Sequence, residues 1–300
     1  MKTVTVLMST YNGEKYLREQ IDSLIHQVSV KLSILVRDDG SSDSTCAILD
    51  EYQEKGVLHW YTGENLRSAR SFLNLVQTAG DSDYYAFCDQ DDVWKTDKLQ
   101  RAVTALESMP KDNKPRLYCS NYQLVDASLN KLPDNGHVTT TTFNESLVSS
   151  CCTGCTVVFD YELKKLLSIG TPKVIVMHDD WAHKVCLAVG GHVIYDPEKT
   201  LYYRQHGNNV DGGVHSPVHK ALGVVKRITS KDRIRSKQLL EILRIYEEYI
   251  SYDNRAALSG LGKTNKNLFN RLQIIRNPNL RTNISKLDKG FIIAILFNYF

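Results

Sequence analysis

Short apolar runs alternate with amphipathic stretches over the first hundred residues of the chain. Residues 4–10 (VTVLMST) are apolar and rich in residues that favour strands, and apolar residues from Leu17 to Ile25 then recur at helical spacing. The same succession of strand, polar loop and helix is repeated three more times up to residue 108. Strands that alternate with helices predict an α/β domain with a mainly parallel central sheet flanked by helices.

The boundaries of the later elements follow from the same pattern. We expect strands at 32–37, 57–61 and 84–88, and helices that begin near Ser44, Ser68 and Thr96. Beyond residue 108, a further strand is expected at 116–126, and an apolar run follows at 155–159. The stretch 193–210 predicts two short strands joined by a loop.

Three polar loops directly follow predicted strands. They cover residues 9–13, 38–43 and 89–92. Ligands of open parallel sheets bind at the carboxyl ends of the strands, so these loops are expected to gather at one edge and form the binding site.

The loop at 89–92 carries three carboxylates within four residues. Asp89, Asp91 and Asp92 follow the apolar run YYAFC, and carboxylates this close repel one another. Their oxygen atoms suit Mg²⁺ or Mn²⁺ bridged to a phosphate-bearing substrate. The alternative is an acidic helix N-terminus, with Asp92 as the cap. The position after a buried strand favours the metal site.

A second acidic pair, Asp38 and Asp39, also ends a predicted strand. Alone, the sequence DDGS is an ordinary turn. Together with Thr10, Tyr11 and Asn12 it becomes a candidate nucleotide pocket, because carboxylates accept hydrogen bonds from a base or from ribose hydroxyls. The glycine-rich dinucleotide and P-loop motifs are absent from the sequence.

The distribution of charge divides the chain into two regions. The net charge of +3 combines −7 over residues 1–215 with +10 over residues 216–300. We therefore expect a catalytic domain at 1–215 and a basic, mostly helical region at 216–300. Basic regions often face nucleic acid, but no stacking-aromatic or zinc pattern supports a nucleic-acid partner here.

The C-terminal region is predicted to be amphipathic. Leu239, Ile242, Leu243, Tyr246 and Tyr249 form one apolar stripe, and the final apolar run at 291–300 is too short to span a bilayer. Such helices either contact a membrane surface or pack on the first domain, and the sequence leaves both possibilities open.

Cysteine usage and the N-terminus bear on the compartment. The chain has seven cysteines and begins without the pattern of a secretory signal, which favours a reducing, cytoplasmic location. We interpret Cys151, Cys152 and Cys155 as small packing residues, because no second Cys or His pair at zinc-site spacing accompanies them.

Five motifs in order carry a resemblance to a known family. They are STYNGEKYLREQIDSLIHQ, VRDDGSSDST, FCDQDDVWKTDKL, HDDW and YYRQHGNN. Over residues 3–212 the chain resembles bacterial family 2 glycosyltransferases with the GT-A fold, in particular the rhamnosyltransferase-like group that builds cell-wall and capsular polysaccharide.

The resemblance implies roles for individual residues. Thr10, Tyr11 and Asp38, with Asn12 and Asp39 beside them, match the part that holds the pyrimidine base of a nucleotide sugar. Asp89 matches the first acid of the D-x-D motif, near ribose and metal. The metal ligands implied are Asp91, with Asp92 as a competitor, and His206; Arg204 would assist at the diphosphate.

The motif HDDW implies the catalytic base. Asp179 matches the expected acid, whereas Asp180 stands where relatives more often have an aromatic residue, so Asp180 remains the alternative. Neighbouring Trp94 and Trp181 either stack on sugars or belong to the core.

The function implied is inverting, metal-dependent transfer from a nucleotide sugar, with dTDP-L-rhamnose as the first choice of donor and UDP-hexoses as alternatives. A polyprenyl-diphosphate-linked saccharide is the acceptor implied, reached at the inner face of the plasma membrane. Two other classes remain: a nucleotidyltransferase that makes nucleotide sugars, although its usual glycine-rich phosphate loop is missing, and a non-catalytic binding module.

Overall fold

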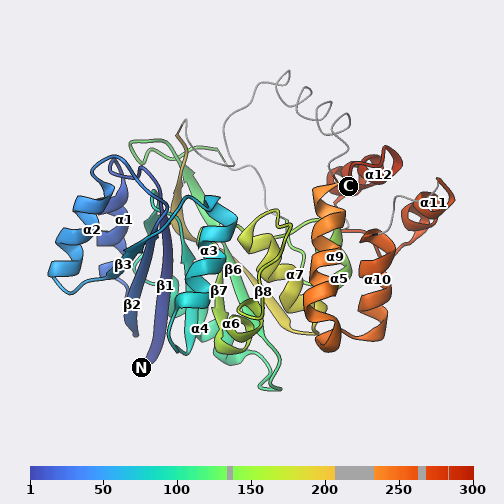
Figure 1. Cartoon of the computed structure of the whole chain (residues 1–300), viewed down its shortest axis with the longest axis horizontal. Helices are drawn as coiled ribbons and strands as arrows, with labels where there is room; N and C mark the ends of the chain where they lie inside the picture. Colours follow the sequence, from blue (N-terminus) through green and yellow to red (C-terminus); the bar gives the residue numbers. More distant parts are fainter. Residues whose placement is uncertain (134–137, 207–232, 263–267, 283) are drawn as a thin grey trace.

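The core of the protein is a single mixed sheet. The computed structural model describes residues 1–133, 138–206, 233–262, 268–282 and 284–300. Within these ranges, eight strands pair in the order β3-β2-β1-β4-β7-β6-β8-β5 (Figure 1). The strands are β1 (Lys2–Thr10), β2 (Val30–Asp38), β3 (His59–Thr62), β4 (Tyr84–Cys88), β5 (Val93–Trp94), β6 (Arg116–Val125), β7 (Val158–Asp160) and β8 (His192–Arg204).

The N-terminal half of the sheet is parallel, as the alternating pattern predicts. β3, β2, β1 and β4 run in the same direction, and the register pairs Thr10 with Asp38 and Met8 with Cys88. The loops after β1, β2 and β4 therefore leave the sheet at one edge. This register is what brings the three polar loops together.

The C-terminal half of the sheet differs from the expectation in one respect. The prediction of two short strands within 193–210 is wrong for its described part, because β8 is one strand from His192 to Arg204 that pairs with β6. Register shifts near Asn121 mark an irregularity in this pairing and replace the loop that was expected between two strands. β7 runs antiparallel to both of its neighbours, β4 and β6.

Helices cover both faces of the sheet and divide the core into two layers. One layer lies under α1 (Leu17–Ile25), α2 (Thr45–Glu54) and α4 (Lys98–Ser108). The other lies under α3 (Arg67–Thr78), α6 (Tyr161–Leu167) and α7 (His178–Ala188), with α5 (Phe143–Val148) and the 3-10 turn η1 (Gly154–Thr156) nearby. Alternate residues of each strand supply the two layers, as strand geometry requires.

The C-terminal helices continue the second layer. They are α9 (Ile234–Tyr246), η2 (Glu247–Tyr249), α10 (Tyr252–Gly262), α11 (Leu268–Arg276) and α12 (Ser285–Leu296). Leu239, Ile242 and Tyr246 are buried in the same cluster as Trp181, whose ring centroid lies 6.0 Å from that of Tyr246. The apolar stripe of α9 thus packs against Trp181 of α7 and the second core layer, whereas Tyr249 in η2 is exposed.

The final apolar run is also partly buried. Phe291, Ile295 and Phe300 belong to the core, while Phe297 is exposed. Among the described residues, no helix combines the length and the apolar character that crossing a bilayer requires. The boundary expected between residues 215 and 216 lies outside the described residues, so the division into two domains stays a prediction.

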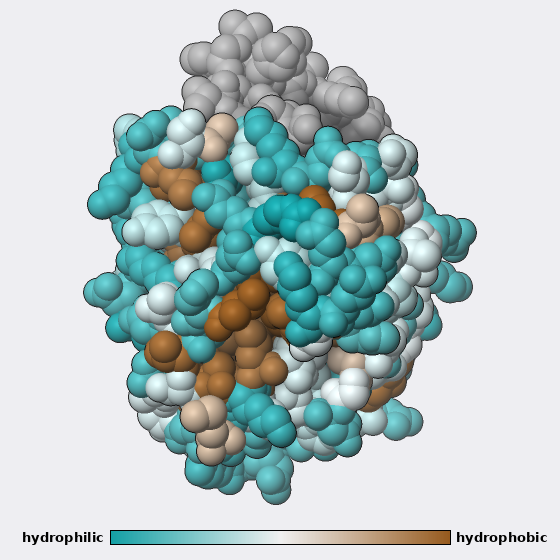
Figure 2. Space-filling model, turned by 90° about the vertical axis from the view of Figure 1, so that its left-hand side faces the viewer, coloured by the Kyte–Doolittle hydropathy of each residue, from teal (hydrophilic) through white to brown (hydrophobic). Residues whose placement is uncertain are grey.

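The surface over the N-terminal part of the fold is mostly polar. Figure 2 views the molecule from the side that carries α1 and α2 in Figure 1, and hydrophilic residues dominate this face. Its hydrophobic residues gather in small patches near the middle.

Candidate active site

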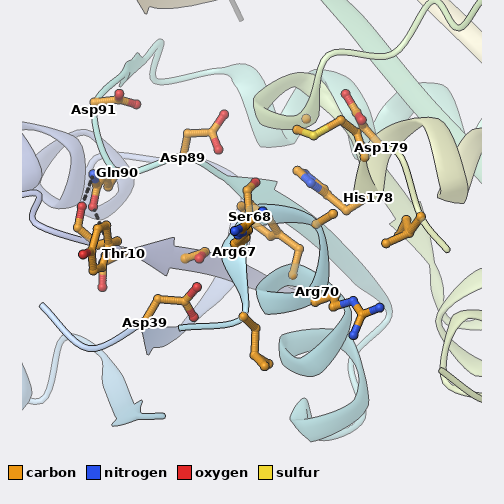
Figure 3. Close-up of a pocket in the computed structure, with 18 of the residues that line it drawn as sticks. Thr10, Asp39, Arg67, Ser68, Arg70, Asp89, Gln90, Asp91, His178 and Asp179 are labelled. Atoms are coloured by element: carbon orange, nitrogen blue, oxygen red, sulfur yellow. Dashed lines mark hydrogen bonds between the residues drawn. The ribbon is translucent and has the colours of Figure 1, made fainter. Parts of the chain in front are cut away.

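A cavity of about 780 Å³ opens at the edge of the sheet where the polar loops meet. Its walls come from the ends of β1, β2 and β4, from the start of α3, and from the segments 153–154 and 175–179. Figure 3 shows Thr10, Asp39, Asp89 and Asp91 on one side and His178, Asp179 and Arg70 on the other. The position of this cavity confirms that the three loops meet.

The two adjacent acids after β2 have different environments. Asp38 is fully buried, and its carboxylate accepts hydrogen bonds from the Thr10 hydroxyl (3.0 Å) and from the backbone N–H groups of Gly40 (2.9 Å) and Ser41 (2.8 Å). Asp39 lines the cavity instead. Asp38 therefore shapes the loop, and Asp39 is the acid of this pair that a ligand meets.

The buried guanidinium group of Arg37 orients Asp39. Its carboxylate forms an ion pair with Arg37, whose guanidinium also donates to the Asn74 side chain (3.0 Å) and to the Glu64 carbonyl (2.9 Å). These contacts fix a hydrogen-bond acceptor at the cavity wall, which suits a base N–H or a ribose hydroxyl.

The first loop is positioned by side chains from its neighbours. Gln90 accepts from the Tyr11 backbone N–H (2.9 Å) and donates to the Tyr11 carbonyl (3.1 Å), so the loops after β1 and β4 are joined directly. Asn12 has a left-handed backbone (φ 48°), and its side chain accepts from the Ser42 N–H (2.9 Å). Tyr11 lines the cavity, whereas Asn12 braces the loop.

The three acids of the loop at 89–92 differ in whether they face the cavity. Asp89 and Asp91 line the cavity, while Asp92 is fully buried and accepts from the Arg204 backbone N–H (3.1 Å). One Asp92 oxygen has no hydrogen-bond partner among the described residues. Asp92 thus lies behind the two acids that face the ligand, although one of its oxygens is within 4.8 Å of an Asp89 oxygen.

The charges of the loop are mutually unfavourable. Burial, followed by the charges of Asp91 and Asp179, raises the pKa of Asp89 to about 8. Burial, Asp91 and Asp89 likewise raise the pKa of Asp92 well above its ordinary value. A cation beside the loop would offset both effects.

The donor set fits a divalent ion. The Asp91 carboxylate lies 2.7 Å from Nε2 of His206, so an oxygen donor and a nitrogen donor meet at the acidic loop, while Asp89 shares a second group of donor atoms, all within 4.8 Å, with Asp92 and the Cys155 thiol. Carboxylate oxygens with one imidazole suit Mn²⁺, and Mg²⁺ takes the carboxylates. Residues 207–209, which complete the motif RQHGNN, lie outside the described residues.

Arg204 occupies a different place from the expected contact with the diphosphate. Its guanidinium is buried and donates to the carbonyls of Asp91 (2.8 Å) and Ala127 (2.6 Å), and it forms an ion pair with Glu19. Arg204 does not line the cavity. Its position supports the backbone of the acidic loop, so it is a positioning residue.

The two acids of HDDW are also separated by their surroundings. Asp179 lines the cavity, and its carboxylate accepts the backbone N–H of Asp180 (2.7 Å). Asp180 forms an ion pair with Lys184 on the same helix, α7. Its carboxylate also accepts a hydrogen bond from the side-chain amide of Gln238 on α9 (2.6 Å). Burial acts to raise the pKa of Asp180, but Lys184 lowers it overall. Asp180 is therefore a structural ion-pair partner.

His178 contributes an aromatic face. Its ring stacks on Phe72 with centroids 3.8 Å apart and meets Phe87 edge-on at 4.7 Å. Burial lowers the pKa of His178 to about 3, so the ring is neutral at physiological pH. A Cβ on Gly154 would lie 2.6 Å from its Nε2 atom, which explains the glycine at that position.

Both tryptophans considered for sugar stacking are core residues. Trp94 and Trp181 are buried and absent from the cavity wall, so the stacking alternative is wrong for both. The sequence interpretation missed Arg67, Ser68 and Arg70, which line the cavity. The sequence pattern could have indicated these residues, because they follow β3, another parallel strand that ends at the same edge as β1, β2 and β4.

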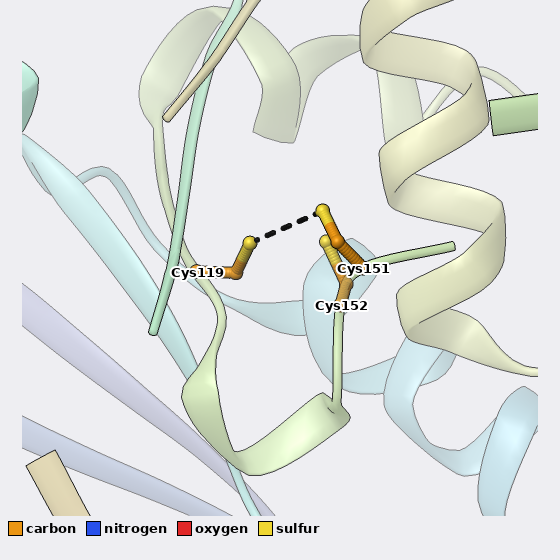
Figure 4. A group of neighbouring side chains, drawn as sticks. All are labelled: Cys119, Cys151 and Cys152. Carbon is orange, nitrogen blue, oxygen red and sulfur yellow. Dashed lines mark hydrogen bonds between the residues drawn. The ribbon is translucent and has the colours of Figure 1, made fainter. Parts of the chain in front are cut away.

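The cysteines form a cluster that spacing did not reveal. Cys119 on β6 lies with its Sγ atom 3.5 Å from that of Cys151, and the Sγ atoms of Cys119, Cys151 and Cys152 lie within 4.8 Å of one another (Figure 4). Nε2 of His183 is 3.9 Å from the Cys151 sulfur. Cys119 and His183 approach Cys151 only through the fold and form no pair at zinc-site spacing in the sequence, so the interpretation of Cys151, Cys152 and Cys155 as packing residues stays a prediction, in line with the burial of Cys152 and Cys155.

Comparison with known proteins identifies the family. Residues 5–167, more than half of the chain, match glycosyl transferase family 2. The chain therefore belongs to this family and is a glycosyltransferase, and inversion is a general feature of family 2 enzymes. Family membership sets aside the nucleotidyltransferase and the non-catalytic module.

Individual relatives agree with the family. The dTDP-rhamnosyl transferase RfbG of Shigella flexneri is 30% identical over 237 residues, which cover 73% of this chain and 79% of the relative. The UDP-Glc:alpha-D-GlcNAc-diphosphoundecaprenol beta-1,3-glucosyltransferase WfgD of Escherichia coli is 29% identical over 163 residues, which cover 53% of this chain and 61% of the relative.

Solved structures support the GT-A-like fold. S. aureus TarS in complex with UDP superposes with a TM-score of 0.60 at 18% identity, over 100% of this chain and 89% of the other. The mannosyltransferase PcManGT of Pyrobaculum calidifontis, in complex with GDP-Man and Mn²⁺, gives a TM-score of 0.54 at 18% identity, over 99% and 85% of the two chains. These likenesses concern the fold alone.

Proposed function

We propose that this glycosyltransferase moves L-rhamnose from dTDP-L-rhamnose to a hydroxyl of a lipid-linked saccharide, with inversion and with the help of Mn²⁺ or Mg²⁺. The observation that carries the proposal is one cavity with Asp39, Asp89 and Asp91 on one wall and Asp179 on the other. The similarity to a dTDP-rhamnosyl transferase supports the donor. A UDP-hexose is the alternative donor, because a relative is named as a UDP-glucose-dependent enzyme.

The donor would bind along the strand ends. Asp39, Thr10 and Tyr11 hold the pyrimidine and ribose, since Asp39 is a fixed acceptor and the Tyr11 backbone is clamped by Gln90. Thymine and uracil share the edge that such a pocket recognises. Asp89 lies beside the ribose and the diphosphate.

Asp91 and His206 would hold the divalent ion, with Asp89 next to them. When bound, the ion neutralises the negative charge that develops on the departing diphosphate. Asp92 and Arg204 keep the loop in place from behind.

Asp179 would act as the general base. A hydroxyl is a weak nucleophile at neutral pH, and a carboxylate within hydrogen-bond reach takes its proton as the new bond forms. The acceptor oxygen then bonds to the anomeric carbon while the bond from that carbon to the diphosphate oxygen breaks. A single displacement inverts the anomeric centre. Asp180 is unsuited to this role because Lys184 and Gln238 hold it.

The acceptor proposed is a saccharide on a polyprenyl diphosphate, in line with the name of the E. coli relative. Such acceptors lie at the inner face of the plasma membrane, so we propose a cytoplasmic enzyme with a catalytic domain at 1–215 and a C-terminal region at 216–300 that approaches the membrane.

A donor panel tests the proposal. Purified protein is titrated with dTDP-L-rhamnose, UDP-glucose, UDP-galactose and UDP-GlcNAc, each with and without Mn²⁺. We expect tightest binding for dTDP-L-rhamnose and weaker binding of all donors when the metal is removed. Preference for a UDP-hexose would replace the donor, and binding that is indifferent to Mn²⁺ would contradict the metal-dependent site.

A further inference from the structure

A small basic hollow adjoins the cavity on the side of Asp179. Its volume is about 270 Å³, and it is lined by Arg70, Lys173, Val174, Ile175, Ile234 and Lys237. Arg70 and Ile175 also line the main cavity, so the hollow borders it. Three basic and three aliphatic side chains thus share one recess beside the proposed base.

Hydrogen bonds between distant segments build the hollow. Arg70 at the start of α3 donates to the Lys173 carbonyl (2.9 Å), and the Lys173 N–H donates to Glu241 on α9 (2.7 Å). Gln238 accepts the Val176 N–H (2.6 Å) and thereby fixes α9 against the segment that leads to Asp179. α9 carries Lys237 and Ile234 to the rim as a result.

The charges around the hollow favour an anion. Arg70, Lys173 and Lys237 are all exposed to solvent at this recess. Glu241 is paired with Arg244 (2.7 Å) and also feels the charge of Lys173, while Asp180 is paired with Lys184, so three cations face the recess with Glu241 as their acidic neighbour among these contacts. Concentrated positive charge raises the local concentration of anionic ligands and strengthens their binding.

The two adjoining spaces together offer the groups that one kind of molecule needs. Asp179 and the segment 175–177 line the main cavity, and the hollow beside it combines three cations with Val174 and Ile234, the latter 40% exposed. A lipid-linked acceptor presents the matching groups, which are a hydroxyl, a saccharide, a diphosphate and an apolar chain. The donor diphosphate belongs at Asp89 and Asp91, on the other wall.

We propose that the hollow formed by Arg70, Lys173 and Lys237 binds the diphosphate of a polyprenyl-diphosphate-linked acceptor, with Ile234 and Val174 contacting the first part of the lipid. This subsite rests on the proposed function for its biological meaning. Its physical content, the binding of a prenyl diphosphate beside Asp179, is testable without any transfer reaction.

The first test measures binding of farnesyl diphosphate to the full chain in EDTA. Metal removal disables the donor site, whose carboxylates repel a free diphosphate. We expect farnesyl diphosphate to bind more tightly than farnesol, and the double variant Lys173→Gln/Lys237→Gln to weaken this binding about tenfold. The matched control Lys31→Gln/Lys55→Gln removes two exposed lysines elsewhere and should stay within about twofold of the unmodified protein.

Several results would overturn the subsite. They are equal binding of farnesyl diphosphate and farnesol, unchanged binding in Lys173→Gln/Lys237→Gln, or an equal loss in the control pair. If the double variant loses affinity for phosphatidylglycerol vesicles as strongly as for farnesyl diphosphate, the hollow is a membrane contact and the proposal is wrong. Asp91→Ala should leave binding in EDTA intact, which separates a failure here from a failure of the proposed donor site.

Discussion

The two walls of the cavity differ in how the chain builds them. The wall that we propose binds the donor (the donor wall) consists mainly of loops after parallel strands within residues 1–92, to which β8 and the residues after it add Tyr203 and His206. The acceptor wall combines the turn at 153–154, the segment 175–179 and, through Gln238, a helix that begins at Ile234. One wall follows from a repeated local pattern, and the other depends on contacts between remote segments.

The walls also differ in charge. Asp39, Asp89 and Asp91 make the donor wall acidic, whereas Arg70, Lys173 and Lys237 make the recess beyond Asp179 basic. An acidic wall needs a bound cation before it can receive a diphosphate, whereas a basic recess binds a diphosphate directly. A transferase that handles two diphosphates can thus keep them apart by using two kinds of charge.

The largest effect is expected for Asp91→Ala, which removes a proposed metal ligand from the donor wall. We expect transfer to fall by about a thousandfold or more, because the charge on the leaving diphosphate loses its compensation. Calorimetry with dTDP and UDP should show that nucleotide binding no longer responds to Mn²⁺. Asp81→Ala, at an exposed acid outside the cavity, is the control and should behave like the unmodified protein. Retained Mn²⁺ dependence in Asp91→Ala would remove this residue from the metal site.

The second-largest effect on transfer is expected for Asp179, on the acceptor wall. Asp179→Asn should lower transfer by about a hundredfold to ten-thousandfold, the range that general base catalysis contributes, while nucleotide binding changes less than twofold. Single-turnover rates and donor titrations separate the two quantities. Loss of donor binding would place Asp179 on the donor wall instead.

Gln238→Leu probes the link between α9 and the acceptor wall. The variant removes hydrogen bonds to the Val176 N–H and to Asp180, and we expect the free energy of unfolding to fall by about 1–3 kcal/mol. Transfer should decrease while nucleotide affinity is retained. Urea unfolding of Gln238→Leu and of Gln100→Leu, an exposed position on α4, gives the comparison. Equal stability of the two variants would contradict the link.

The raised pKa of Asp89 predicts a pH-dependent metal affinity. Because that pKa is about 8, the metal-free site holds a proton at pH 6 that Mn²⁺ must displace. Mn²⁺ affinity should therefore rise between pH 6 and pH 8, by at most about tenfold per pH unit. Calorimetry in buffers of different ionisation enthalpy should detect the released proton. An affinity that is flat over this range would show that Asp89 is already ionised.

The smallest effect at neutral pH is expected for His178→Phe. The unfolded chain protonates this histidine below about 6.5, whereas the folded protein, in which the pKa is about 3, does not. Folded-state stability is thus lost as the pH falls from 6.5 towards 3, by at most about 1.4 kcal/mol per pH unit. His178→Phe should remove this part of the acid sensitivity in unfolding experiments at pH 7 and pH 4.5. An unchanged difference between the two pH values would contradict burial of a neutral ring.

The local pattern of the sequence determined the parallel half of the fold and the donor wall. Apolar strands followed by polar loops identified the places of Thr10, Asp39, Asp89 and Asp91, because parallel strands end at a common edge and each strand is continuous in sequence. The apolar stripe of α9 was likewise visible in the sequence, although its partner was not.

Tertiary structure alone decided which member of each acidic pair faces the cavity. Asp38, Asp92 and Asp180 are drawn into hydrogen bonds and ion pairs by Thr10, Arg204 and Lys184, and adjacent residues with the same side chain carry no sequence signal of this difference. The cysteine cluster and the basic hollow likewise depend on the tertiary structure. Each joins residues far apart in the chain, and only packing sets the distances on which their chemistry depends.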